Sequence, residues 1–279
     1  MLSYRHAFHA GNFADVLKHS VLAYVLEYMA KKEKGYCYFD SHSGAGMYQL
    51  ADDYAQKTGE YKDGIDKLYQ KNNLPPLLDS YVDLIQSLNN RAELSVYPGS
   101  PAIAQAYARK QDTARLFEIH PTDFELLTEF TDTWKQCRLQ KKDGYKGVVS
   151  QMPPTTRRGV LLIDPPYEIK DDYQKAVDTV VKAHTKFATG TFIIWYPVVK
   201  RHFIDAMEKG LTDSGIRNIL QTELCLLADS EEYGMTGTGL FIVNPPWQLE
   251  AELETALPYL VSTLGTQKSQ FTLRQLVNE

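Results

Sequence analysis

The chain has 279 residues, of which 43% are hydrophobic and 23% charged. This length supports one large α/β domain with a substantial core. No apolar run reaches the roughly 18 residues that cross a bilayer, and no apolar secretory segment follows Met1. Three widely spaced cysteines disfavour a disulfide framework and a zinc cluster and fit a reducing compartment. We therefore expect a cytoplasmic protein without membrane span or metal.

The net charge of −5 disfavours a nucleic-acid partner only if the charge is spread evenly. Positive charge is instead gathered in residues 1–36 and in residues 135–158. In the second stretch, Asp143 is the one acidic residue among Lys135, Arg138, Lys141, Lys142, Lys146, Arg157 and Arg158. Solvated basic faces are common, but phosphates respond to the local field. The two stretches therefore leave an RNA partner open.

The first predicted element is a helix over about residues 13–33, where apolar residues recur at helical spacing. Asn12 is its predicted N-cap, and Asp15 lies in its first turn. Aromatic and basic residues alternate in the tail before it: Tyr4, Arg5, His6, Phe8 and His9. A frayed terminus is the ordinary interpretation of such a tail. A tail of this composition can also order over a site when RNA binds, so Tyr4, Arg5 and His6 are candidate substrate-binding residues.

Short β-branched or aromatic runs predict seven strands, at Tyr36–Asp40, Ala114–Ile119, Arg138–Lys142, Val160–Ile163, Thr191–Tyr196, Ile219–Leu227 and Leu240–Val243. Helical patterns lie between most of them, which indicates a mostly parallel sheet covered on both faces. Only a turn-rich stretch separates the last two strands, so we expect an antiparallel pair at one edge. The prediction is a Rossmann-like α/β fold with a seven-stranded sheet.

The first two strands are too far apart for a simple strand–helix–strand unit, which needs about 30 residues. The excess, residues 48–96, contains helical patterns at Gly64–Gln70 and Leu77–Leu88. We predict a small helical insertion there, within a main domain formed by residues 1–47 and 97–279. Insertions at strand ends often bear on substrate recognition, and equally often are tolerated padding.

A glycine-rich loop follows the first predicted strand: Asp40-Ser41-His42-Ser43-Gly44-Ala45-Gly46. Glycines allow a close backbone approach to a ligand, and Asp40 suits a cofactor with a free amino group. A nicotinamide-dependent oxidoreductase would carry a complete G-x-G-x-x-G fingerprint, but Gln49 stands at its third position. A lone G-x-G is weak evidence, since most are turns.

Two further strand ends strengthen the cofactor prediction. Glu118 closes the second strand, where a carboxylate can accept both hydroxyl protons of a ribose. Asp143-Gly144 follows the third strand, and its carboxylate could accept a proton from an adenine amino group. Each alone is more often a helix cap or a surface carboxylate. Together they follow parallel strands that share one crevice, which favours S-adenosylmethionine.

The strand Val160–Ile163 ends in Asp164-Pro165-Pro166-Tyr167. The prolines stiffen the loop, and their carbonyls are free to accept. Asp164 and the Pro165 carbonyl would hold the hydrogens of an exocyclic amine and expose its lone pair for methyl transfer. Tyr167 would stack on an extruded base. A simple strand-terminating turn is the alternative interpretation.

A second motif of the same kind, Asn244-Pro245-Pro246-Trp247, follows the strand Leu240–Val243. That strand is last in the chain, whereas the strand before Asp164 should neighbour the first. We therefore assign the reaction to Asp164 and treat Asn244 as structural.

These features resemble the RlmJ family of bacterial 23S rRNA adenine-N6 methyltransferases over nearly the whole chain. The most specific strings are Met1–His6, Phe8–Asn12, Asp15–His19, Gly59–Tyr61, Tyr97–Pro101, Ile163–Tyr167 and Trp195–Val199. The loop departs slightly from the family, with Ser41, Ser43 and Met47 in place of Thr, Ala and Arg. A phosphate contact made there by relatives is therefore in doubt.

The resemblance implies S-adenosylmethionine as cofactor and one adenine of 23S rRNA as substrate. It implies cofactor contacts from His19, His42, Ser100, Glu118, Asp143, Gly144 and Asp164, to which we add Lys18, Asp40, Gly44 and Gly46. Asp164 would be catalytic, with Pro165 and Tyr167, and Tyr4 would meet the target adenosine. We expect a monomer acting on free or early precursor rRNA. A DNA-adenine or protein-glutamine methyltransferase, or a non-catalytic RNA-binding Rossmann module, remain alternatives.

Overall fold

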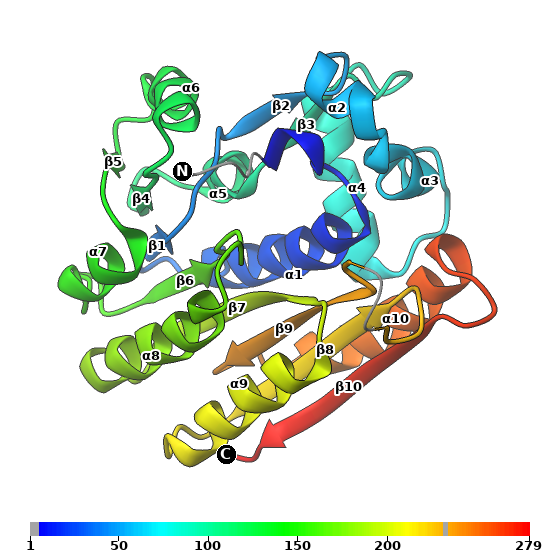
Figure 1. Cartoon of the computed structure of the whole chain (residues 1–279). Coiled ribbons are helices and arrows are strands. Elements are labelled where there is room, and N and C mark those ends of the chain that lie inside the picture. Colours follow the sequence, from blue (N-terminus) through cyan, green and yellow to red (C-terminus); the bar gives the residue numbers. More distant parts are fainter. Residues whose placement is uncertain (1–5, 231–233) are drawn as a thin grey trace.

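The protein, described here as a computed structural model over residues 6–230 and 234–279, is built around an eight-stranded mixed sheet (Figure 1). Five neighbouring strands are parallel, in the spatial order β5 (Cys137–Gln140), β4 (Thr113–Phe117), β1 (Cys37–Asp40), β6 (Gly159–Ile163) and β7 (Thr191–Val198). The sheet continues through β9 (Gly237–Val243) and β8 (Ile219–Cys225) to β10 (Gln270–Val277), with each of these pairs antiparallel. The predicted α/β, Rossmann-like class is confirmed.

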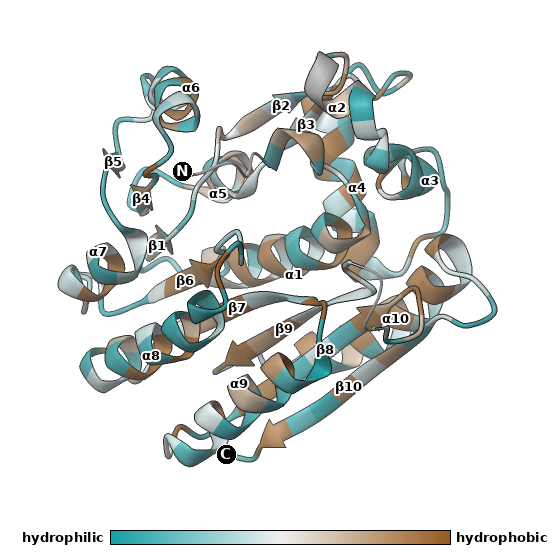
Figure 2. Cartoon of the chain, in the orientation of Figure 1, coloured by the Kyte–Doolittle hydropathy of each residue, from teal (hydrophilic) through white to brown (hydrophobic). Residues whose placement is uncertain are grey.

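The sheet differs from the prediction at one edge, where the antiparallel pair β8–β9 is present but does not end the sheet. β9 lies between β7 and β8, and the unpredicted β10 pairs with the outer side of β8. The sequence of β10 mixes polar and apolar residues, and none of its side chains is fully buried. Its hydrophobic pattern is therefore weak. In Figure 2, hydrophilic and hydrophobic residues alternate along β10, whereas the central strands are mostly hydrophobic.

Helices cover both faces of the sheet. One face packs against α1 (Phe13–Ala30), α5 (Ser100–Tyr107) and α10 (Leu249–Leu264), and the other against α7 (Gly144–Ser150), α8 (Asp171–Lys186) and α9 (Arg201–Asp213). α6 (Pro121–Thr131) follows β4 and packs beside β5. In the described part of the chain, no helix is both long and apolar enough to cross a membrane.

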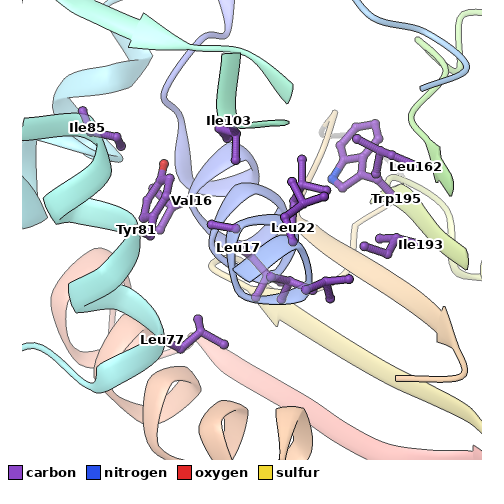
Figure 3. Packing of buried hydrophobic residues seen from close by; sticks show 14 of the residues in the cluster. Val16, Leu17, Leu22, Leu77, Tyr81, Ile85, Ile103, Leu162, Ile193 and Trp195 are labelled. Carbon is purple, nitrogen blue, oxygen red and sulfur yellow. The ribbon is translucent and has the colours of Figure 1, made fainter. Parts of the chain in front are cut away.

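α1 is buried around most of its circumference. Figure 3 shows Leu22 close to Leu162, Ile193 and Trp195 of the sheet, with α4 (Pro76–Leu88) on the opposite side of the helix. Asn12 caps it as predicted, because its side chain accepts hydrogen bonds from the backbone N–H groups of residues 14 and 15. The helix ends at Ala30, three residues before the predicted limit of 33. There the Arg109 guanidinium donates to the Ala30 carbonyl, one of the last carbonyls of the helix, which lack partners within it.

The segment predicted as an insertion is largely helical. It contains α2 (Asp53–Thr58), the 3-10 helix η2 (Glu60–Asp63), α3 (Asp66–Tyr69) and α4, and β2 (Met47–Gln49) and β3 (Val96–Pro98) cross its predicted limits of 48 and 96. β2 and β3 pair as an antiparallel ribbon at its base. A further 3-10 helix, η1 (His6–Phe8), precedes α1. α4 shares an apolar cluster with α1, so the division into two domains stays a prediction.

Candidate active site

A cavity of about 320 Å³ lies at the carboxyl edge of the parallel strands, against the first turns of α1. This is the edge at which open α/β sheets bind ligands. The structure brings eleven of the predicted site residues to its wall: His6, Lys18, His19, His42, Gly44, Ser100, Glu118, Asp143, Gly144, Asp164 and Pro165. The glycine loop and the Asp164 loop therefore share one cavity, as the prediction of a single site requires.

Asp40 and Gly46 lie behind the cavity wall. The Asp40 carboxylate is fully buried and accepts hydrogen bonds from Tyr38 Oη at 2.7 Å and Ser100 Oγ at 2.6 Å. Burial raises the pKa of Asp40 to about 6. Asp40 thus connects Ser100 to the end of β1 through a hydrogen bond. A direct contact between Asp40 and the cofactor stays a prediction.

Glycines are needed at this wall for two different reasons, one in the loop after β1 and one at the start of α7. Gly44 and Gly46 have φ of +60° and +85°, which side chains other than glycine rarely adopt. Gly144 meets the loop from α7, and a Cβ there would lie 1.7 Å from the Ser41 carbonyl oxygen. The two loops thus touch backbone to backbone and form one continuous wall.

Glu118 ties the loops after β1 and β4 together. Its Oε2 accepts from the Gly44 N–H at 2.8 Å, and its Oε1 accepts from the N–H groups of Ile119 and His120 at 2.8 and 2.7 Å. Burial raises the pKa of this carboxyl. Each oxygen has two lone pairs, so Oε2 keeps acceptor capacity toward the cavity.

Two histidines on the wall are neutral at physiological pH. His42 lies edge-on to the Tyr145 ring, and burial lowers its pKa to about 4. Burial likewise lowers the pKa of His19 to about 3, although Asp15 opposes this shift. His19 Nδ1 is 2.8 Å from Tyr97 Oη, which orients the ring. Neither ring adds positive charge to the site.

Asp164 is held by a buried ammonium group. Lys18 Nζ lies 2.6 Å from Asp164 Oδ2 and 2.9 Å from Asp15 Oδ1. Burial alone would lower the pKa of Lys18, but the two carboxylates raise it above its usual value. Asp15 Oδ2 also accepts from Gly11 N–H and lies 2.9 Å from His6 Nε2. The sequence identified Asp15 only as a first-turn acid, whereas it joins the tail to Lys18.

Tyr167 follows the two prolines with φ of +51°. Its hydroxyl donates to the Trp195 carbonyl at 2.5 Å, and its ring centroid lies 4.5 Å from that of Tyr173. The half-buried ring therefore packs against residues of α8 and β7. Stacking on a target base stays a prediction for this residue. Tyr4 and Arg5, also predicted to bind substrate, lie outside the described residues.

The second proline motif lies at the amino ends of the parallel strands, opposite to the cavity. β9 runs antiparallel to β7, so its end at Asn244 is beside Thr191, where β7 begins. The Asn244 side chain donates to the carbonyls of Ala188 and Gly190, both at 2.8 Å. These hydrogen bonds give Asn244 the structural place expected from the sequence.

The wall also contains residues that the sequence did not single out as site residues: Ser41, Ser43, Tyr48, Gly99, Ile119, His120, Asp123, Lys142, Tyr145, Pro166, Glu168, Ile169, Asp172 and Lys175. Several directly follow β4 or β6, so extending the strand-end argument by two or three residues would have found them. Tyr48 and Asp172 had no such signal, because their positions depend on long-range packing.

The strand order and the cavity at the carboxyl edge define a class I, S-adenosylmethionine-dependent methyltransferase fold. The model of one family, described as "Ribosomal RNA large subunit methyltransferase D, RlmJ", matches residues 33–277. The chain belongs to this family, which confirms the resemblance found in the sequence.

Three relatives illustrate the similarity. The chain is 46% identical to ribosomal RNA large subunit methyltransferase J of Escherichia coli K12, over 95% of this chain and 94% of that protein. It is 48% identical to the protein of the same name from Haemophilus influenzae, with the same coverage. A crystal structure of a protein from Legionella pneumophila, 35% identical, superposes with a TM-score of 0.89 over 96% of this chain and 98% of the other.

Proposed function

We propose that this protein transfers a methyl group from S-adenosylmethionine to the exocyclic N6 amino group of one adenine in 23S rRNA. The observation that carries the proposal is Asp164, at the rim of the cavity, with one carboxylate oxygen fixed by Lys18. The names of the two bacterial relatives support large-subunit rRNA as substrate. The protein would act as a cytoplasmic monomer on free or early precursor rRNA.

The cavity wall suits the proposed cofactor. Gly44 and Gly144 allow the close packing that forms this wall, because a Cβ would lie 2.3 Å from Tyr48 Oη at the first and 1.7 Å from the Ser41 carbonyl oxygen at the second. Glu118 Oε2 can accept from ribose hydroxyls, and Asp143, the N-cap of α7, also lies on the wall. When bound, S-adenosylmethionine supplies a methyl group on a positively charged sulfur.

Asp164 and Pro165 would supply two hydrogen-bond acceptors for the target amine. The lone pair of an exocyclic amine is delocalised into the ring, so the nitrogen is a poor nucleophile. Among residues 6–230 and 234–279, no hydrogen-bond donor lies on Asp164 Oδ1. That oxygen and the Pro165 carbonyl would accept the two amine hydrogens and draw the nitrogen toward tetrahedral geometry. The substituted nitrogen is acidic after transfer, so its proton leaves without a strong base.

Lys18 fixes one oxygen of Asp164. The buried Lys18 ammonium lies 2.6 Å from Oδ2, so this oxygen already has a charged hydrogen-bond donor. Asp15 holds the other side of the ammonium, so Lys18 is not free to turn toward Oδ1. The remaining carboxylate oxygen is thereby reserved for substrate.

RNA would approach over the tail and the basic stretch. His6 lies on the cavity wall, and Lys142 of residues 135–158 lies there too. Tyr4 and Arg5 precede His6 and would reach the target nucleotide with it. Tyr167 would support the flipped base from the strand end, either by stacking or by holding its loop.

The test is methyl transfer from radiolabelled S-adenosylmethionine to rRNA that lacks native methylation, followed by nucleoside analysis. We expect label in N6-methyladenosine of 23S rRNA. Label in duplex DNA or in protein glutamine alone would contradict the RNA substrate and support those alternatives. Calorimetry should detect S-adenosylmethionine or its demethylated product but not NAD. Absence of any transfer would support the non-catalytic module.

A further inference from the structure

The N-terminal tail lies on the helical segment that the sequence marked as an insertion. η1 contacts α2, and the Phe8 carbonyl accepts a short hydrogen bond from Thr58 Oγ1. Lys57 Nζ lies 5.8 Å from the centroid of the Phe8 ring. These two residues end α2, so the tail and the insertion meet there.

A second contact lies at the turn between tail and α1. Gly11 has φ of +79°, and its carbonyl accepts a hydrogen bond from Ile65 N–H at 2.9 Å. A Cβ on Gly64 would lie only 2.1 Å from the same carbonyl oxygen. The backbones of the two segments are therefore in direct contact, which only glycine at position 64 allows.

Glu60 joins these two contacts. Its Oε1 lies 2.9 Å from His9 Nδ1, and its Oε2 accepts from Asn12 Nδ2 at 2.9 Å. The Asn12 amide cannot be reversed without loss, because its oxygen caps α1. A carboxylate is thus the side chain that satisfies both donors at once.

His6, three positions before His9, lies on the cavity wall. His6 Nε2 is 2.9 Å from Asp15 Oδ2, and its ring lies edge-on to Tyr48 of β2, with centroids 5.3 Å apart. Fixing His9 and Asn12 therefore also fixes where His6 enters the cavity wall. The string Gly59-Glu60-Tyr61, so far without a role, lies at the centre of this arrangement.

We propose that residues 57–65 are a dock for the tail and that Glu60 is its positioning residue, which holds residues 6–12 in place for the RNA. The role in catalysis rests on the proposed function. The dock itself rests on the contacts alone. The hydrogen bond with Glu60, in which the carboxylate accepts, also raises the pKa of His9, in agreement with a charge-assisted contact.

The test compares Glu60→Gln with Asp63→Asn. Both remove one negative charge from η2, but Asp63 is 85% exposed and pairs only with Lys67 among the described residues. Glu60→Gln keeps a similar shape but offers one oxygen instead of two, so it cannot accept from both His9 and Asn12. We expect it to lower kcat/KM for rRNA about tenfold, mainly through KM, which corresponds to about 1.4 kcal/mol. The Kd for S-adenosylmethionine should stay within about twofold in both variants.

Three results would overturn the dock. The first is equal kcat/KM in the two variants, because insertion charge rather than tail position would then be responsible. The second is a loss of cofactor affinity as large as the loss for RNA, which a general structural defect would cause. The third is additive losses when His9→Gln is combined with Glu60→Gln, because residues of one contact should not add.

Hydrogen exchange separates the dock from the proposed function. In the free protein, the amides of residues 9–12 and of Ile65 should exchange faster in Glu60→Gln than in Asp63→Asn. If rRNA is not methylated by the wild-type protein but this difference is present, the proposed function fails and the dock stands. If exchange is the same in both variants, the dock fails even when methylation is observed.

Discussion

Two strands of this protein end in nearly the same four residues, yet only one of these ends lies at the cavity. Asp164-Pro165-Pro166-Tyr167 follows β6, and its first three residues lie on the cavity wall, whereas Asn244-Pro245-Pro246-Trp247 follows β9 at the opposite edge. The direction of the strand decides the difference, because β6 is parallel to β1 and β9 is antiparallel to β7. A short motif gains chemical meaning from the edge on which it lies.

Asp164 and Asn244, the first residues of the two motifs, also have different partners. Asp164 meets the charged group of Lys18, and its side chain is 14% exposed at the cavity. The Asn244 amide donates to two backbone carbonyls and joins two loops. One position keeps an acceptor for a ligand, and the other uses both of its amide hydrogens inside the protein. Substitutions at corresponding positions should therefore separate activity from stability.

The largest effect is expected for Asp164→Ala. It removes the acceptor for the target amine, and loss of one such group commonly costs about 10²–10³-fold in rate. Lys18 keeps Asp15 as a partner, so much of the fold should persist. Transfer assays measure the activity, and urea titration measures the stability. Activity within about tenfold of wild type would show that Asp164 is not the reacting end.

Asn244→Ala should act on stability instead. It leaves two carbonyls without donors and places alanine at φ of +51°, so we expect a loss of about 2 kcal/mol in the free energy of unfolding. Urea titration measures it, and kcat/KM should stay within about twofold. Asn244→Gly relieves only the backbone and should lose less. A fall in activity without a fall in stability would contradict the structural assignment.

Tyr167→Phe tests the fourth position of the first motif. It keeps the ring but removes the hydroxyl that donates to the Trp195 carbonyl, so we expect a loss of about 1 kcal/mol in unfolding free energy. If the ring stacks on the target base, kcat should change little, because the ring remains. A large loss of kcat would assign the hydroxyl itself to the reaction.

Trp247→Ser should have the smallest effect. The Trp247 side chain is 86% exposed at the edge away from the cavity, and such surface changes usually alter stability by less than about 0.5 kcal/mol. Thermal unfolding and rRNA methylation should both match the wild type. A loss of methylation alone would mean that RNA also contacts the second motif.

The features that could be predicted from the sequence are those that depend on residues close together in the chain. The cap at Asn12, the strand runs and the residues at their ends follow from local patterns, and strand order then places Glu118, Asp143 and Asp164 together. The antiparallel direction of β9 also followed from a short connection. These features need no knowledge of distant packing.

The remainder depends on pairs that are distant in sequence. Glu60 and His9 are 51 residues apart, and Asp40 and Ser100 are 60 apart, so no local pattern connects them. Asp40 was expected at the cofactor, but Tyr38 and Ser100 take up one of its oxygens behind the wall. β10 was missed because an exposed edge strand needs little hydrophobic patterning.

The ion pair of Lys18 and Asp164 joins residues 146 positions apart. Closing so long a loop costs more entropy than closing a short one. During synthesis, α1 leaves the ribosome long before β6 exists, with the Lys18 ammonium still lacking one of its two counterions. A chain truncated before residue 164 therefore cannot form this ion pair, so the candidate active site depends on the synthesis of β6.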